Sequence, residues 1–167
     1  MSRLSPLMLA LSLPSLIACQ TPAQQAPSAA EAVVEREAQG PQIQSDDILA
    51  REQQTETASV KHVLISWDAL GPTLQGRHDP RAAERTQAEA AALIRDIQQE
   101  YEDGADFSTL MALYSEDGGS AKSGRAYDVT RDGDLAFMFK RLSLRLRPGE
   151  TGIVETPFGY HLILRLE

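Results

Sequence analysis

Two segments with the pattern of buried strands, 60–67 and 160–166, lie near opposite ends of the apolar part of this 167-residue chain. Each places one histidine among apolar side chains, His62 in the first segment and His161 in the second. Short apolar runs bounded by turn residues are typical of strands in a packed sheet. We therefore expect one domain in which the two strands bring their histidines to a shared site.

The sequence between these strands carries the start signals of three helices. Thr86 and Glu89 fit a capping box, in which each side chain bonds the backbone N–H of the other, and the helix runs to about Glu102. Asp106 is placed to cap a second, shorter helix, and Asp134 to cap a third. The third helix carries apolar residues on one side, as a helix packed on a sheet does.

Two shorter strand-like segments, 125–130 and 152–156, complete the pattern, and residues 157–159 form a turn into the last strand. The resulting order is strand, helix, helix, strand, helix, strand, strand. This order predicts an α+β domain in which helices cover a small sheet.

Composition separates this domain from the residues before it. The formal net charge of -8 argues against nucleic acid as the main partner, because a phosphate-binding surface carries a basic bias. From Gln20 to about Thr57 the residues Gln, Ala, Pro, Glu and Ser dominate and aromatics are absent. Such a segment buries too little apolar surface to offset its ordering entropy. We expect residues 19–57 to be a disordered acidic tether and the domain to span 58–167.

The N-terminus has the pattern of a bacterial lipoprotein signal. A short basic start is followed by the apolar run 4–17, which is shorter than the roughly 20 residues of a membrane span. Cys19 follows, and it is the only cysteine, so no disulfide forms within the mature chain. We expect a signal peptide at 1–18 and lipid on Cys19. Because Gln20 is not acidic, the expected location is the outer membrane, facing the periplasm; the alternative is a general secretory signal with an incidental cysteine.

Six motifs occur in a specific order and spacing: KHVLI at 61–65, GADFSTL at 104–110, YSED at 114–117, SAK at 120–122, LRPGE at 146–150 and TPFGYHLI at 156–163. Together they resemble the parvulin (PpiC-type rotamase) family of peptidyl-prolyl cis-trans isomerases, over about residues 59–167. The resemblance implies a parvulin-like fold of the FKBP-like class. In that fold about three helices surround a four-stranded antiparallel sheet, in the order β-α-α-β-α-β-β.

The resemblance also implies the catalytic residues. His62 and His161 match the paired sheet histidines beneath the substrate, where we expect them to hydrogen-bond to each other. Asp117 matches the position, cysteine or aspartate in the family, that lies close to the prolyl peptide bond. Thr156 matches a hydroxyl that supports the histidines. No cofactor or metal is expected, since no short-spaced ligand motif supports a zinc site.

The apolar substrate pocket is implied in the same way. Leu135, Phe139 and Phe158 fall where the family holds the proline ring, and Met138 lies beside them on the same helix. The family usually continues its Ser-Ala-Lys motif with Gly-Gly-Asp-Leu-Gly, whereas this chain has Gly-Arg-Ala-Tyr-Asp at 124–128. Tyr127 then replaces the leucine that walls the pocket.

Each of these residues also has an ordinary structural interpretation. A single strand histidine usually makes a structural hydrogen bond, Asp117 alone is a loop aspartate, and a Leu135–Phe139 pair at helical spacing is usually core. We expect a monomeric isomerase acting on proline-containing unfolded or extended exported polypeptides. The alternative is a weakly catalytic or non-catalytic peptide-binding chaperone or assembly module. Arg77 and Arg81 form no dense basic cluster, so no phosphate requirement is expected.

Overall fold

The computed structural model describes residues 43–75 and 79–167 of the chain. The expected signal peptide at 1–18, the lipidation site Cys19, most of the expected tether and Arg77 lie outside the described residues. Among the residues that are described, none of the helices combines the length and apolar character needed to cross a membrane.

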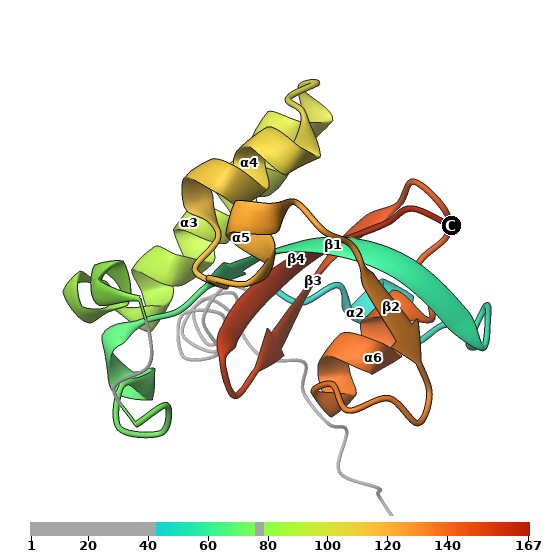
Figure 1. The fold of residues 1–167 in the computed structure, drawn as a ribbon, viewed down its shortest axis with the longest axis horizontal. Helices are drawn as coiled ribbons and strands as arrows, with labels where there is room; N and C mark the ends of the chain where they lie inside the picture. The colour runs from blue at the N-terminus through green and yellow to red at the C-terminus, as the bar shows by residue number, and fades with distance from the viewer. Residues whose placement is uncertain (1–42, 76–78) are drawn as a thin grey trace, which may run out of the picture.

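The described strands form one antiparallel sheet in the order β2-β1-β4-β3 (Figure 1). Their bounds are Thr57–Ile65 for β1, Tyr127–Thr130 for β2, Thr151–Thr156 for β3 and Gly159–Arg165 for β4. The expected four-stranded antiparallel sheet is confirmed. The two histidine strands, β1 and β4, are neighbours at its centre, so segments about 100 residues apart in sequence build the middle of the domain.

Helices cover both faces of this sheet (Figure 1). Their bounds are Asp46–Leu49 for α2, Gln87–Glu102 for α3, Phe107–Tyr114 for α4, Ser120–Ser123 for α5 and Phe137–Ser143 for α6, with 3-10 turns η1 at Asp68–Leu70 and η2 at Pro80–Glu84. One face packs against α3 and α4, which bury Ile94, Ile97 and Met111 against it. The other face packs against α6 and α2, where Leu142 and Leu49 are buried.

The packed structure begins upstream of residue 58, where the sequence placed the start of the domain. The backbone N–H of Ser45 donates to the carbonyl of Ile153 on β3, and the Ile153 N–H donates to the Ser45 hydroxyl, each at 2.9 Å. Ile48 and Leu49 are buried beside α6. Residues 45–49 therefore pack against the body of the domain.

Two of the three expected helix caps are confirmed and one is wrong. Thr86 and Glu89 form the capping box of α3, and the Asp106 carboxylate accepts from the backbone N–H of Thr109 at the start of α4. Asp134 does not cap α6, because the helix begins at Phe137 and its N-cap residue is Ala136, with no side-chain cap. Leu135 therefore lies in the segment that leads into the helix, and not on a helical stripe.

The turn between β3 and β4 approaches the end of β1 very closely. Gly159 has φ of +137°, and a Cβ atom there would collide with the carbonyl oxygen of Ile65. The hydroxyl of Ser66 donates to the carbonyl of Phe158 in the same turn. Only glycine fits this position, which fixes the hairpin tip against the end of β1.

Gly159→Ala is expected to lower the free energy of unfolding by about 3 kcal/mol, because it combines an unfavourable backbone angle with a steric collision. Gly149→Ala is the matched control: its φ is +79°, but no atom lies within 4 Å of the added Cβ. The control should lose only about 1 kcal/mol. Chemical denaturation of both variants measures the difference, and equal losses would contradict the role of the close approach.

Candidate active site

His62 and His161 lie on the same face of the sheet, as diagonal neighbours on adjacent strands. The register pairs His62 with Ile163 and Leu64 with His161. Their ring centroids are 5.2 Å apart, and the two residues are only 3% and 6% exposed. The ring of Phe139 of α6 lies 5.2 Å from each histidine ring and is nearly perpendicular to both. The three rings form a compact floor between the sheet and α6.

The two histidines do not hydrogen-bond to each other, contrary to the sequence expectation. Nε2 of His161 lies 2.9 Å from the hydroxyl oxygen of Thr156, and Nε2 of His62 lies 3.2 Å from Oδ2 of Asp117. Both Nδ1 atoms are buried and have no hydrogen-bond partner among the described residues. Each Nε2 atom therefore faces a different residue, Thr156 for His161 and Asp117 for His62.

Asp117 is held by several hydrogen-bond donors at once. Its Oδ2 accepts from the hydroxyls of Ser120 and Tyr127, each at 2.9 Å, and lies near His62. Its Oδ1 accepts from the backbone N–H of Gly119 at 3.0 Å. The His62 contact, followed by the Gly119, Tyr127 and Ser120 bonds, lowers the pKa of Asp117 far below its ordinary value, although partial burial opposes this. The carboxylate is therefore ionised at neutral pH.

His161 has the opposite electrostatic environment. Burial lowers the pKa of His161 well below the ordinary value, and the nearby His62 lowers it further, while the more distant Asp117 opposes both. The ring is therefore neutral at neutral pH. Thr156 can accept from it or donate to it, depending on which ring nitrogen carries the proton.

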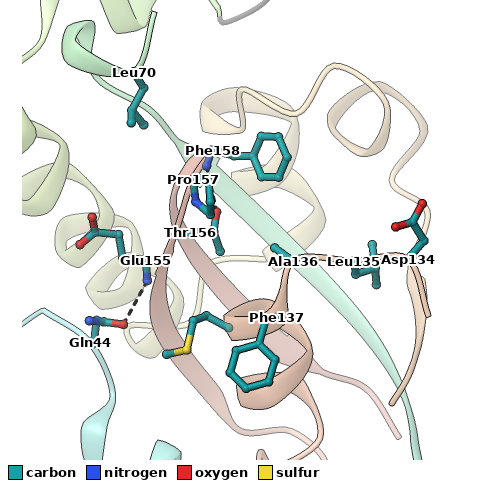
Figure 2. A pocket seen from close by; sticks show the side chains of 11 residues that line it. Gln44, Leu70, Asp134, Leu135, Ala136, Phe137, Glu155, Thr156, Pro157 and Phe158 are labelled. Atoms are coloured by element: carbon teal, nitrogen blue, oxygen red, sulfur yellow. Dashed lines mark hydrogen bonds between the residues drawn. The ribbon is translucent and has the colours of Figure 1, made fainter. Parts of the chain in front are cut away.

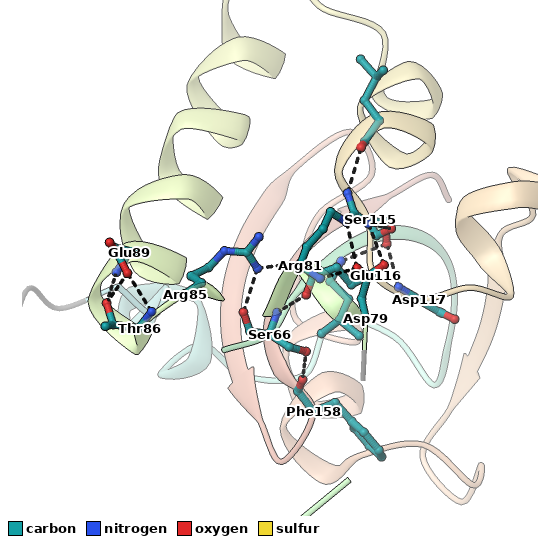
Figure 3. A network of polar contacts seen from close by, with 12 residues as sticks. Ser66, Asp79, Arg81, Arg85, Thr86, Glu89, Ser115, Glu116, Asp117 and Phe158 are labelled. Atoms are coloured by element: carbon teal, nitrogen blue, oxygen red, sulfur yellow. Dashed lines mark hydrogen bonds and ion pairs between the residues drawn. The ribbon is translucent and has the colours of Figure 1, made fainter. Parts of the chain in front are cut away.

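A buried network fixes the loop that carries Asp117 to the end of β1 (Figure 3). The Glu116 N–H donates to the Leu64 carbonyl at 2.9 Å, and its carboxylate accepts from the Ser66 N–H at 2.6 Å. Nη1 of Arg85 lies 2.6 Å from that carboxylate, whose side chain is 1% exposed. The roles of Glu116 and Arg85 were not predicted from the sequence. The one signal for Glu116 is that it directly precedes Asp117 in the YSED motif.

Three of the expected pocket residues line one open hollow of about 1120 Å³, together with Thr156. They are Leu135, Met138 and Phe158. The hollow lies between the β3–β4 turn and the segment that leads into α6 (Figure 2). Phe158 is 48% exposed, so its ring is available to a ligand.

Two other expected pocket residues do not line that hollow. Phe139 is buried and packs against the two histidine rings. The ring of Tyr127 lies 5.2 Å from that of His62, and its hydroxyl bonds Asp117. Both residues therefore contact the polar centre itself.

A second, smaller hollow of about 400 Å³ lies beside Asp117. Leu64, Ser66, Glu116 and Phe158 are among its other lining residues. Phe158 borders both hollows. The structure therefore arranges an apolar hollow, an exposed aromatic ring and an ionised carboxylate along one side of the domain.

Comparison with known protein families matches residues 47–166 to the family described as "PPIC-type PPIASE domain". The chain belongs to this family. The expected parvulin assignment is thus confirmed, and the domain is a peptidyl-prolyl cis-trans isomerase domain. The group of Asp117, His62 and His161, with its apolar floor, is the candidate active site of this parvulin domain.

Two kinds of curated relative share this domain. Chaperone SurA of Chromobacterium violaceum is 40% identical over 80 residues, which cover 47% of this chain and 18% of that protein. Foldase protein PrsA of Oceanobacillus iheyensis is 28% identical over 109 residues, which cover 65% of this chain and 36% of that protein. The match thus spans about a fifth of the first relative and about a third of the second.

Solved structures show the same fold. The solution structure of TbPIN1 superposes with a TM-score of 0.57 at 23% identity, covering 68% of this chain and 99% of that one. The peptidyl-prolyl isomerase ESS1 from Candida albicans gives a TM-score of 0.54 at 18% identity, covering 81% of this chain and 72% of that one. At these identities the likeness establishes the parvulin fold.

The stability of the parvulin domain should fall as the pH drops from 7 to 5. The unfolded chain protonates its histidines near pH 6.5, whereas buried His161 stays neutral in the folded state. The expected slope is at most about 1.4 kcal/mol per pH unit below pH 6.5. The depressed pKa of Asp117 adds no slope here, since aspartate stays ionised in both states above about pH 5. His161→Gln should reduce the slope in urea titrations, and an unchanged slope would contradict this assignment.

Glu116→Gln should lower the free energy of unfolding by about 3 kcal/mol, because it leaves the largely buried guanidinium of Arg85 without its counter-charge. The matched control is Glu56→Gln, which removes an exposed pair with Arg131 at 3.0 Å. That change should cost less than about 1 kcal/mol. Equal losses in parallel denaturation experiments would show that the Glu116 network does not anchor the loop.

Proposed function

We propose that this parvulin domain isomerises X–Pro peptide bonds in unfolded or extended exported polypeptides by a non-covalent mechanism. The observation that carries the proposal is the ionised Asp117 carboxylate, held by four donors next to an exposed aromatic ring and an apolar hollow. Such a site can hold a proline ring in apolar surroundings and present a defined charge to the adjacent amide.

The chemistry requires only a change in the environment of the amide. Rotation about an X–Pro bond crosses a barrier of about 18–20 kcal/mol, because it breaks amide resonance. The twisted amide has a less polar carbonyl and a more basic nitrogen than the planar one. A site that removes the carbonyl from water and stabilises the twisted form accelerates rotation. A reduction of about 4 kcal/mol gives roughly a thousandfold gain in rate.

In this mechanism each residue has a role that follows from its position in the site. Leu135, Met138 and Phe158 hold the proline ring and exclude water, and Phe139 supports them from below. Asp117 sets the electric field at the rotating bond. His161, neutral and bonded to Thr156, and His62, beside Asp117, keep the floor rigid, so no proton has to move during rotation.

The charges around the hollow beside Asp117 favour substrates that carry no phosphate. It is lined by the acidic residues Asp79, Glu116 and Asp117. In the described part of the loop after β1, Arg81 pairs with Asp79 at 3.0 Å and Arg85 pairs with Glu116. These guanidinium groups are already neutralised, so they favour no phosphorylated residue before the proline.

We further propose that the protein works in the bacterial cell envelope. The relatives named chaperone and foldase support a role in protein folding. The N-terminal pattern ending at Cys19 supports a lipid anchor, and the non-acidic Gln20 supports the outer membrane, with a monomeric domain facing the periplasm. The acidic stretch after Cys19 would hold the domain at a distance from the membrane.

The full chain should accelerate isomerisation of a prolyl tetrapeptide, and Asp117→Asn should reduce kcat/KM at least about tenfold, because it removes the charge and keeps the shape. Asp96→Asn, a change at an exposed aspartate of α3, is the control and should leave the rate unchanged. A protease-coupled or NMR exchange assay measures both. Wild-type protein that gives no acceleration would refute the catalytic proposal.

The alternative function is peptide binding with little or no catalysis, as a chaperone or assembly module. The observation that favours it is the altered stretch Gly-Arg-Ala-Tyr-Asp at 124–128, where the family usually has Gly-Gly-Asp-Leu-Gly. NMR titration with the same tetrapeptide separates the two functions. Binding without rate enhancement supports the binding module, and proline-independent binding supports it further.

A further inference from the structure

Tyr127 occupies a position between the polar and apolar parts of the site. It is the first residue of β2 and pairs with Val60 of β1. Its ring lies 5.2 Å from that of His62, tilted by 57°, and 6.4 Å from that of Phe139. These contacts fix the direction of the ring, and therefore the position of its hydroxyl.

That hydroxyl donates a hydrogen bond of 2.9 Å to Oδ2 of Asp117. Burial, and then the hydrogen bond to Asp117, raise the pKa of Tyr127 above its ordinary value, so the phenol is protonated at neutral pH and is a donor. A bond from a neutral donor to an ionised carboxylate is stronger than one between neutral groups. The Tyr127 bond is therefore one of the stronger constraints on Asp117.

The donors to Asp117 come from three different elements. His62 belongs to β1, Ser120 to α5 and Tyr127 to β2, while Gly119 lies in the loop just before α5. The His62 contact is the longest of these at 3.2 Å, and the other three range from 2.9 to 3.0 Å. The segment from Gly119 to Tyr127 therefore closes around the carboxylate and contributes most of its short hydrogen bonds.

From this geometry we propose that Tyr127 is a positioning residue: its hydroxyl holds the Asp117 carboxylate in the orientation that the isomerisation requires. The inference rests on the proposed catalytic function and assigns this hydroxyl a role beyond that of a pocket wall. A charged group stabilises a transition state most effectively when its direction is fixed beforehand, because reorientation during the reaction costs free energy. Tyr127 acts through Asp117 and not on the substrate.

Tyr127→Phe tests the proposal, because it keeps the ring contacts with His62 and Phe139 and removes only the donor. The matched control is Tyr114→Phe, which removes a tyrosine–carboxylate bond of the same 2.9 Å length, to Glu100, outside the site. Tyr127→Phe should reduce kcat about three- to tenfold and leave KM nearly unchanged. It should also shift the ¹³C signal of the Asp117 carboxyl at pH 7, and the control should do neither.

A double-mutant cycle with Asp117→Asn decides whether Tyr127 works through the carboxylate. In the Asp117→Asn background, Tyr127→Phe should cause less than about a twofold further loss, because the oriented charge is already gone. The proposal is overturned if Tyr127→Phe lowers kcat as much in the Asp117→Asn background as in the wild type. It is also overturned if Tyr127→Phe leaves the kcat of an active enzyme unchanged, or changes only KM. An unchanged carboxyl signal overturns it even if the wild type proves inactive, whereas wild-type inactivity by itself refutes only the catalytic function.

Discussion

The pairing of β1 with β4 is the contact on which the rest of this domain depends. It joins segments about 100 residues apart and places both strands at the centre of the sheet. One face of the pair supplies Val63 and Leu162 to the core beneath α3 and α4. The other supplies Val60 and Ile163 to the core beneath α6, and the two histidines lie on this same face. A shift of one residue between the two strands would turn one strand over relative to the other and place the two histidines on opposite faces of the sheet. The stability of the core and the geometry of the site therefore depend on the same register.

The site combines an apolar floor with a polar rim, and the two surroundings set different protonation states for His161 and Asp117. Burial keeps His161 neutral, while Asp117, partly exposed at 24%, keeps its charge because donors surround it. A buried carboxylate without such donors would take up a proton instead. The buried Arg85–Glu116 pair then fixes the adjacent loop to the end of β1. The buried and partly buried polar groups of this region therefore fix the Asp117 carboxylate and the loop that carries it.

Sequence reasoning succeeded where the determining interactions are local. The capping box at Thr86 and the cap at Asp106 each depend on residues within one helical turn, and both are confirmed. Asp134 carried a similar local signal, but the helix begins only at Phe137 and its N-cap residue is Ala136, in a segment that lines the hollow. The role of Glu116 was not predicted either, because its partner Arg85 is 31 residues away and comes close only in the folded chain.

The amino-acid sequence by itself determined the α+β class, the family and the identities of the principal polar residues, since motif order and strand patterns are properties of the chain. The tertiary structure decided how those residues are connected. It separated Leu135, Met138 and Phe158, which line a hollow, from Phe139, which supports the histidines. It also directed each histidine to a different outer partner, Thr156 or Asp117, and gave Tyr127 a hydrogen bond to Asp117. These connections depend on strand register and loop closure, which set distances between residues that are remote in sequence.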